Sequence, residues 1–439
     1  MDENIKQDDK CIRKKNQTKD DDTLTDFQGF MLLLPSYVGV GFLGLPYIVK
    51  LLGLWGGTSG LFFYGFLSEI GALILTGSTQ RLTERTGERF GDMGTLAEMS
   101  MKLGPPCLQP HAGKLKFCVD MCILMTYSLI LPVLISLMNL FGQDFFRHYI
   151  NVSDNVSIIV ISLLLLPVYL TRRMKLLSFL ATAGNIVLLV LFVLSFQFIC
   201  QDLPNVNTRP ATKLLDYITV TSFTNDALFS YGGIIMVLPV RDRMEIKTFD
   251  GWNGLIGLVL IIVIAIHVSC GFFGYLQFGE MTQVNYLLNL PDQWIYRFLK
   301  ILSFLTLYCT NGVSVFVVVE IMWPPFKKRF NTEVIENYGE YICRVFLLIL
   351  SGTFTILVPE FELLMSLTGC IGTMSTTLLF PYVIAILTMY GESKPTLLVD
   401  KVKRKLKLTL CVVMIVFGTY SVIAGLGVSI YMTLYSIIL

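Results

Sequence analysis

Eleven apolar stretches, most of them longer than 20 residues, follow one another along this chain of 439 residues. About 20 apolar residues suffice for a helix to cross the hydrocarbon core of a bilayer. We therefore predict an all-α polytopic membrane protein with eleven transmembrane helices. The predicted spans are Phe27–Lys50, Trp55–Gln80, Phe117–Gly142, Val156–Leu170, Leu176–Cys200, Leu214–Val240, Leu255–Phe278, Trp294–Met322, Tyr341–Val358, Leu363–Tyr390 and Leu408–Ile438.

The composition excludes several other classes of protein. Charged residues make up 15% of the chain, whereas soluble domains carry about 25%. The net charge of +2 provides no basic field for a nucleic acid. The ten cysteines and three histidines show no zinc-ligand spacing and no catalytic constellation. We therefore expect no metal, no cofactor, no nucleic-acid partner and no enzymatic activity.

The distribution of Lys and Arg predicts the orientation in the membrane. With the N-terminus in the cytosol, 28 of the 34 basic residues lie on the inner side, and the C-terminus is outside or lumenal. Residues 1–25 are polar and are expected to form a disordered cytosolic tail, followed by a transmembrane domain over residues 26–439. Two glycosylation sequons, at Asn151 and Asn155, fall in a predicted outer loop and suggest a glycoprotein.

Two predicted spans are interrupted by glycines. Span one contains GVGFLGLPY at residues 39–47, and span six contains SYGGIIMVLP at residues 230–239. The first run matches GxGxxG, but it follows no strand and opens no βαβ unit, so a dinucleotide site is excluded. Close packing of helices through small residues is one explanation. The other is a broken helix, whose free backbone groups are tolerated in a membrane only where they line a cavity or are buried in protein.

The spacing of the two interruptions favours broken helices. They begin about 190 residues apart, and each leads a set of five spans. This pattern is typical of an inverted repeat in which two discontinuous helices meet at the membrane midplane. We expect repeat one over about residues 26–200, repeat two over about 213–390, and an additional helix over about 408–438.

With further motifs added, the chain resembles a known family. The interrupted motifs are accompanied by GYLQFG at residues 274–279, LNLP at 288–291, Trp294 and Glu320. Together they resemble the amino acid/auxin permease family from about Thr25 to span eleven, and most closely its proton-coupled amino acid transporter branch. The resemblance implies a LeuT-like five-plus-five inverted repeat with one extra helix, and transport of small neutral amino acids, often with a proton.

Two positions depart from the pattern of that branch. A Glu usually follows the aromatic residue of the span-six motif, where this chain has Gly232, and a His usually stands at the position of Glu69. The residues that the branch uses for proton coupling and substrate recognition are therefore not carried over.

Ionisable residues inside the spans are candidates for coupling, because charge at the bilayer midplane is costly. Glu69 in span two has two explanations. It either binds and releases a proton during transport, or it has a structural role, in which it is hydrogen-bonded to a neighbouring helix or faces a water-filled crevice. Asp226 in span six either supplies the carboxylate missing at position 232 or, as we favour, caps a helix or forms a structural pair. His267 in span seven is expected to be a packing residue.

The interruptions supply the expected lining of a substrate site, in which Tyr231 walls the side-chain pocket and span eight adds polar groups. The residues are Val40, Gly41, Phe42, Gly44, Ser230, Tyr231, Gly232, Gly233, Tyr308, Thr310 and Asn311.

We therefore expect a secondary active transporter of small neutral amino acids, worked by alternating access and driven by protons. The alternatives are an amino-acid sensor that signals through a partner, and an uncoupled or sodium-coupled carrier. The expected partners are the amino acid, protons and the lipid bilayer. The sequence leaves open whether the membrane is the plasma membrane or a lysosomal or vacuolar one.

Overall fold

The computed structural model describes residues 24–146, 153–172, 174–213, 216–329, 333–358, 360–390 and 398–438. All regular elements in these ranges are helical, with π-helical segments η7 and η8 and 3-10 segments under the other η labels. The elements up to residue 208 are α2 (Asp26–Val38), η1 (Gly41–Gly44), α3 (Leu45–Leu52), α4 (Leu54–Thr86), α5 (Met93–Lys102), η2 (Gln109–His111), α6 (Ala112–Phe146), α7 (Asp154–Tyr169), α8 (Met174–Ile199) and η3 (Val206–Thr208). The remaining elements are α9 (Tyr217–Ser230), η4 (Gly232–Met236), α10 (Val237–Asp242), α11 (Ile246–Phe249), α12 (Leu255–Phe278), η5 (Gly279–Met281), η6 (Tyr286–Asn289), α13 (Trp294–Arg329), α14 (Glu333–Leu357), α15 (Phe361–Thr368), η7 (Gly369–Thr373), η8 (Ser375–Leu379), α16 (Phe380–Tyr390) and α17 (Leu398–Ile438).

The structure confirms an all-helical polytopic architecture. Among the described residues, ten helical segments are long and apolar enough to cross a membrane, and α7 is a shorter apolar helix of 16 residues. At 1.5 Å per residue, α7 is about 24 Å long, which is less than the hydrocarbon thickness of about 30 Å. It occupies the place of the predicted fourth span. Asn155 is exposed in its first turn, whereas Asn151 and most of the predicted tail lie outside the described residues.

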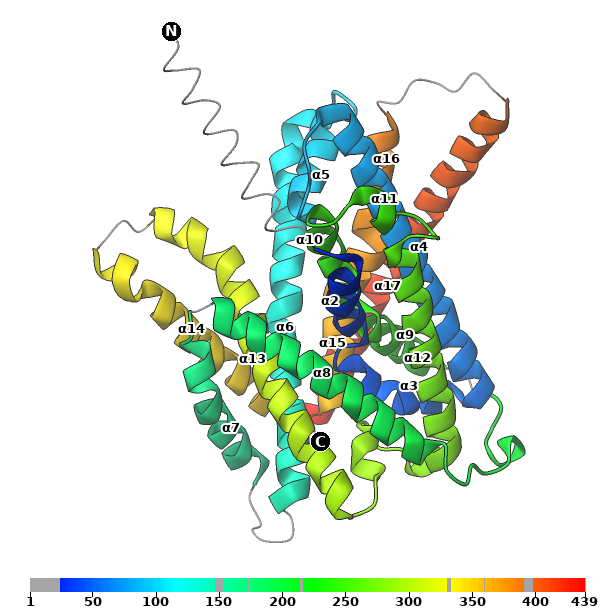
Figure 1. Cartoon of the computed structure of the whole chain (residues 1–439), viewed down its shortest axis with the longest axis vertical. Helices are drawn as coiled ribbons and strands as arrows, with labels where there is room; N and C mark the ends of the chain where they lie inside the picture. The colour runs from blue at the N-terminus through cyan, green and yellow to red at the C-terminus, as the bar shows by residue number, and fades with distance from the viewer. Residues whose placement is uncertain are drawn as a thin grey trace.

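Two groups of helices form the bundle (Figure 1). In the first, α12 packs against α2, α3 and α4, and α9 packs against α3 and α4. In the second, α6, α7, α13 and α14 pack against one another. Helices α15 and α17 also pack against α9. Most residues in the apolar part of both interrupted segments are buried, so the two segments lie in the interior of the molecule.

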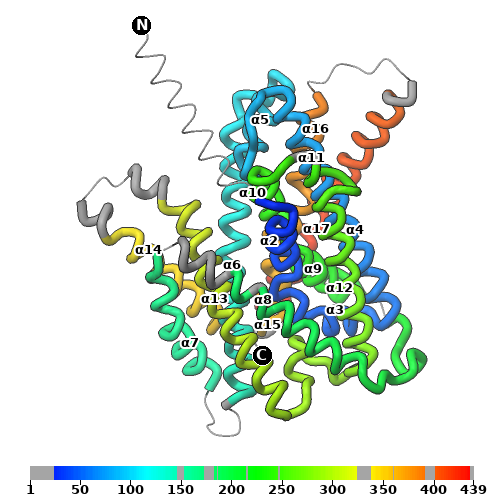
Figure 2. The backbone as a smooth tube through the Cα atoms, in the orientation of Figure 1, coloured from blue at the N-terminus to red at the C-terminus, as the bar shows by residue number. Residues whose placement is uncertain are grey.

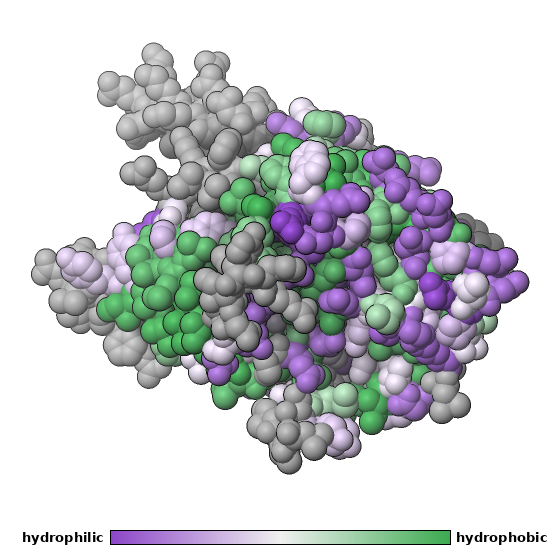
Figure 3. Space-filling model, turned by 90° about the horizontal axis from the view of Figure 1, so that it is seen from below, coloured by the Kyte–Doolittle hydropathy of each residue, from purple (hydrophilic) through white to green (hydrophobic). Residues whose placement is uncertain are grey.

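Apolar side chains on the outside of the bundle match a lipid environment. The outward faces of α7 and α17 carry large exposed hydrophobic residues, among them Val160, Leu163, Val416 and Ile423. In water such faces would favour aggregation, whereas in a bilayer they contact the acyl chains. Figure 3 looks onto one end of the bundle, where hydrophilic residues are frequent.

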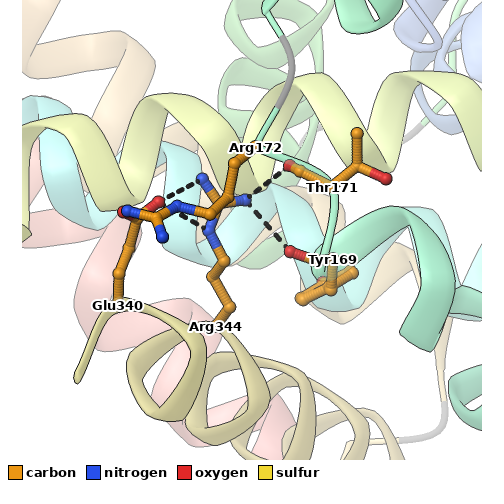
Figure 4. Close-up of polar contacts among 5 residues, drawn as sticks. All are labelled: Tyr169, Thr171, Arg172, Glu340 and Arg344. Carbon is orange, nitrogen blue, oxygen red and sulfur yellow. Dashed lines mark hydrogen bonds and ion pairs between the residues drawn. The ribbon is translucent and has the colours of Figure 1, made fainter. Parts of the chain in front are cut away.

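A buried arginine joins α7 to α14 (Figure 4). The guanidinium of Arg344, whose side chain is 1% exposed, donates hydrogen bonds to the carbonyl oxygens of Tyr169 (3.0 Å) and Thr171 (3.1 Å). It also pairs with Glu340, which in turn contacts Arg172. The last carbonyl groups of a helix have no partner within the helix, so Arg344 supplies donors at the end of α7.

Candidate functional site

The first interruption divides span one into α2, η1 and α3. A capping box starts α2, in which Thr25 Oγ1 accepts from the Gln28 amide at 3.3 Å and the Thr25 amide donates to Gln28 Oε1 at 3.0 Å. At its other end Gly39 has φ +45°, and its amide donates to the carbonyl of Pro35 at 2.8 Å. A residue with a Cβ is strained at this dihedral angle, so the glycine ends the helix. The chain then tightens into η1 before α3 begins.

The second interruption has the same order in span six. Asp216 caps α9 by accepting a hydrogen bond from the Thr219 amide at 3.2 Å. The helix ends at Ser230, η4 follows from Gly232, and α10 continues from Val237. The 3-10 turns leave both segments without a continuous α-helical ladder. The predicted breaks at both glycine motifs are therefore present in the structure.

The two interruptions contact each other, although they are far apart in the sequence (Figure 2). Ser230 Oγ lies 3.4 Å from the carbonyl oxygen of Gly41, 189 residues away. A Cβ placed on Gly41 would lie 2.7 Å from the Cα atom of Ser230, and one on Gly233 would lie 2.5 Å from Cγ of Tyr37. Glycine is thus required at both positions because the backbones approach so closely.

Span ten covers the second interruption with a π-helical stretch that the sequence analysis did not include. A Cβ on Gly232 would lie 2.6 Å from Cγ2 of Thr373 in η7, and η8 also packs against η4. π-Helical turns are rare and occur frequently at functional sites. A signal for this segment existed in the dense run of Gly, Ser and Thr between Ser366 and Thr377, inside an otherwise apolar span.

The predicted lining residues differ in where their side chains lie. Phe42 is buried, with its ring edge-on to Phe192 at 6.2 Å and to Tyr286 at 5.9 Å, so it faces α8 and η6. Val40 is half-buried between α2 and η1, and Gly44 lies next to the side chain of Met365.

Tyr231 lies between α4 and α12. Its hydroxyl donates to the carbonyl of Leu61 at 3.1 Å, and its ring packs on that of His267 with 4.7 Å between the centroids. His267 is fully buried, and its Nδ1 lies 2.8 Å from the carbonyl oxygen of Val263. Both contacts support the expected packing role of His267.

The polar residues of span eight point elsewhere. Asn311 is fully buried, and its Oδ1 accepts a hydrogen bond from the Tyr169 hydroxyl at 2.8 Å, which ties α13 to α7. Thr310 Oγ1 donates to the carbonyl of Thr306 in its own helix, and Tyr308 is half-buried. These contacts direct Asn311 toward α7 rather than toward the interruptions.

Both predicted carboxylates are buried. Glu69 in α4 and Asp226 in α9 are each 2% exposed, and each has one carboxylate oxygen without a hydrogen-bond partner. Asp226 lies in the interior of α9 and does not cap it, since Asp216 does. An unpaired carboxylate in a low-dielectric interior is costly, so both groups are strong candidates for binding a proton.

A cavity of about 480 Å³ lies apart from the interruptions, between α6, α7 and α13. Its walls are largely apolar, and they include Phe141, Ile161, Phe304 and Lys300. Lys300 pairs with Asp144 at 2.6 Å. Such walls suit an acyl chain better than the charged groups of a free amino acid.

Two interrupted helices that meet inside a multi-pass bundle are typical of membrane transport proteins. Comparison with known proteins agrees with this class: the model of the family described as "Transmembrane amino acid transporter protein" matches residues 22–430. The chain belongs to this family, and it is a multi-pass membrane transporter rather than an enzyme. The resemblance inferred from the glycine motifs is thereby confirmed.

Two relatives are similar over nearly the whole chain. The protein named "Proton-coupled amino acid transporter-like protein pathetic" from Drosophila melanogaster is 26% identical over 414 residues, which cover 92% of this chain and 85% of the relative. "Probable amino acid transporter skat-1" from Caenorhabditis elegans is 23% identical over 425 residues, which cover 93% and 90%.

Proposed function

We propose that this transporter carries small neutral amino acids and that the contact between the two interruptions is its substrate site. The observation that carries the proposal is the close approach of Gly41 to Ser230 and of Gly233 to Tyr37. Where a helix is broken, the ends of its two halves have N–H and carbonyl groups without partners. The free N–H groups can bind the α-carboxylate of an amino acid, and the free carbonyl groups can bind its ammonium group. Small residues let that backbone-to-backbone recognition occur.

The proposed lining is Val40, Gly41, Phe42 and Gly44 with Ser230, Tyr231, Gly232 and Gly233, and Tyr308 and Asn311 are weaker candidates. Thr373, which covers Gly232, joins this set. Because Tyr37 and Thr373 already crowd the glycines, the space left for a substrate side chain is small. This crowding favours glycine, alanine or proline as the substrate.

The proposed architecture is an inverted repeat of five plus five spans, with repeats over about 26–200 and 213–390 and an extra helix over about 408–438. The grouping of helices supports it: spans one, two, six and seven pack together, as do spans three, four, eight and nine. Each group therefore holds matching members of both repeats. Rocking of one group against the other exposes the site alternately to the two sides.

Proton coupling is proposed through Glu69 and Asp226, whose buried carboxylates each have an oxygen without a hydrogen-bond partner. The printed name of the Drosophila relative, a proton-coupled amino acid transporter-like protein, supports this part of the proposal. In vesicles, Glu69→Gln should abolish the response of uptake to a pH gradient. A response like that of the wild type would exclude Glu69 from coupling.

The test of the substrate site is uptake of labelled glycine, alanine and proline into proteoliposomes. Gly41→Leu and Gly233→Leu should each abolish uptake, because Leu fills the contact between the interruptions. Gly77→Leu is the matched control, because a Cβ at Gly77 in α4 meets no atom within 4 Å. Uptake that survives in both site variants would overturn the site assignment.

The proposed topology places the N-terminus in the cytosol and the C-terminus outside or in a lumen, in the plasma membrane or a lysosomal or vacuolar membrane. The exposure of Asn155 at the start of α7 is compatible with a glycan on the outer side. Changing Asn151 and Asn155 to Gln together should remove any glycan-dependent shift in gel mobility.

A further inference from the structure

Helix α17 is longer than a membrane crossing requires. It contains 41 residues and is about 60 Å long at 1.5 Å per residue, whereas the hydrocarbon core of a bilayer is about 30 Å thick. A substantial part of α17 therefore lies outside the hydrocarbon core. In Figure 1 its N-terminal end stands away from the other helices, at the end of the molecule that carries α5 and α11.

The N-terminal turns of α17 are strongly basic. Residues 401–407 have the sequence KVKRKLK, and no acidic residue follows them in the helix. Lys401, Lys403 and Lys405 are exposed, and none of the three forms an ion pair with another residue that the structure describes. Like charges four residues apart, such as those of Lys401 and Lys405, destabilise a helix. Anionic groups outside the chain would relieve this repulsion.

An exposed apolar stripe runs along α17 beside these lysines. Its residues follow one another at intervals of three or four and so share one helix face. They are Val402, Leu406, Leu410, Val413, Val416, Tyr420 and Ile423. The part from Val413 onward faces the acyl chains of the bilayer, and the stripe continues without a break to Val402. The basic turns therefore lie against the membrane, where lysine side chains extend over the apolar surface and reach the headgroups.

Arg404 fixes the basic turns to the end of span ten. Its guanidinium donates to the carbonyl of Met389 at 2.7 Å, and Arg85 of α4 donates to the neighbouring carbonyl of Thr388 at 3.2 Å. Both carbonyls belong to the last turn of α16, where the backbone has acceptors without a partner in the helix. Arg404 thus has a structural partner within the chain, whereas the three exposed lysines remain for a partner outside it.

We propose that residues 401–407 of α17 form a binding site for the anionic headgroups of membrane lipids. The lysine ammonium groups contact the phosphate groups of the headgroups, and Val402 and Leu406 contact the adjoining acyl chains. Clusters of about four to eight Lys or Arg residues beside a transmembrane helix bind such lipids, because anionic headgroups give the cytosolic leaflet a negative surface potential. The assignment to the cytosolic leaflet rests on the proposed topology, whereas lipid binding depends neither on it nor on the proposed function.

Binding of fluorescent short-chain lipids to the purified full-length protein in detergent tests the site without any amino acid. Fluorescence polarisation should show tighter binding of phosphatidylserine than of phosphatidylcholine, and the tightest binding of phosphatidylinositol bisphosphate, whose headgroup carries the most negative charge. The triple variant Lys401→Gln, Lys403→Gln and Lys405→Gln should lose at least about tenfold in affinity for both anionic lipids, since each lysine near an anionic surface contributes about a factor of five. Equal affinities of the wild type for the three lipids would overturn the proposal.

The matched control removes the same charge from other exposed residues on the predicted cytosolic side. The triple variant Arg89→Gln, Lys102→Gln and Lys114→Gln should bind all three lipids like the wild type. An equal loss in this control would mean that only net charge matters, and it would contradict a site in α17. Raising the NaCl concentration from about 0.1 M to about 1 M shortens the screening length from about 10 Å to about 3 Å, so it should weaken binding of the anionic lipids. Inorganic phosphate should compete no better than NaCl of equal ionic strength, and stronger competition would indicate a site for free phosphate instead of lipid.

Discussion

Gly41 allows the central contact to be tested with a single methyl group. A Cβ at this position would lie 2.7 Å from Cα of Ser230 and 3.2 Å from its Cβ and Oγ atoms. Ordinary carbon contacts are about 3.5–4.0 Å long, so Gly41→Ala requires the two interruptions to separate by roughly 1 Å. One of the opposing atoms is backbone and cannot rotate away.

The free-energy cost of this separation can be taken from the effect of inserting methyl groups into other well-packed protein interiors. An additional methyl group in a tight interior costs about 1–3 kcal/mol. If the contacting arrangement is a necessary state of the transport cycle, its population falls by about 5- to 150-fold, since about 1.4 kcal/mol corresponds to a factor of ten. Initial uptake of labelled alanine into proteoliposomes should decrease by the same order.

Gly184→Ala is the matched control for this experiment. A Cβ at Gly184, between α8 and α13, would lie 3.7 Å from the Thr306 side chain and 3.9 Å from Cβ of Cys309, which are ordinary contacts. Uptake by this variant should stay close to that of the wild type. Wild-type uptake by Gly41→Ala, with an unchanged elution profile in size-exclusion chromatography, would refute a functional role for the close approach.

Two further predictions concern the surroundings of the site. Arg344→Met should destabilise the protein by about 2–5 kcal/mol, because it leaves the carbonyl groups of Tyr169 and Thr171 without their donor. Glu340 keeps its contact with Arg172 in this variant. Arg172→Met should cost about 1 kcal/mol or less, since that side chain is 42% exposed. Thermal unfolding in detergent compares the two, and equal midpoints would contradict the argument. Tyr231→Phe removes the hydrogen bond to Leu61 at a cost of about 1 kcal/mol and keeps the ring on His267, so the KM for the amino acid should change less than about twofold. A tenfold increase in KM would mean that the hydroxyl group binds the substrate.

The sequence was sufficient for the properties that depend on local chemistry. Runs of about 20 apolar residues located the spans, because a helix of that length crosses the bilayer and satisfies its backbone groups within its own segment. The glycine runs at residues 39–44 and 232–233 located the breaks, since glycine and proline destabilise a helix whatever its tertiary surroundings are. The family followed from the same motifs.

Contacts between distant segments could not be deduced in this way. Asn311 turns toward Tyr169, and Thr373 covers Gly232, because of how whole helices pack. Such pairings depend on tertiary packing, on which the periodicity of one span carries no information.

The most direct test of the account is a panel of labelled amino acids offered to proteoliposomes at two external pH values. The account predicts that glycine, alanine or proline accumulates inside, that acidification of the outer solution increases this accumulation, and that a protonophore abolishes the increase. Uptake no greater than that of protein-free liposomes at both pH values would contradict the central claim.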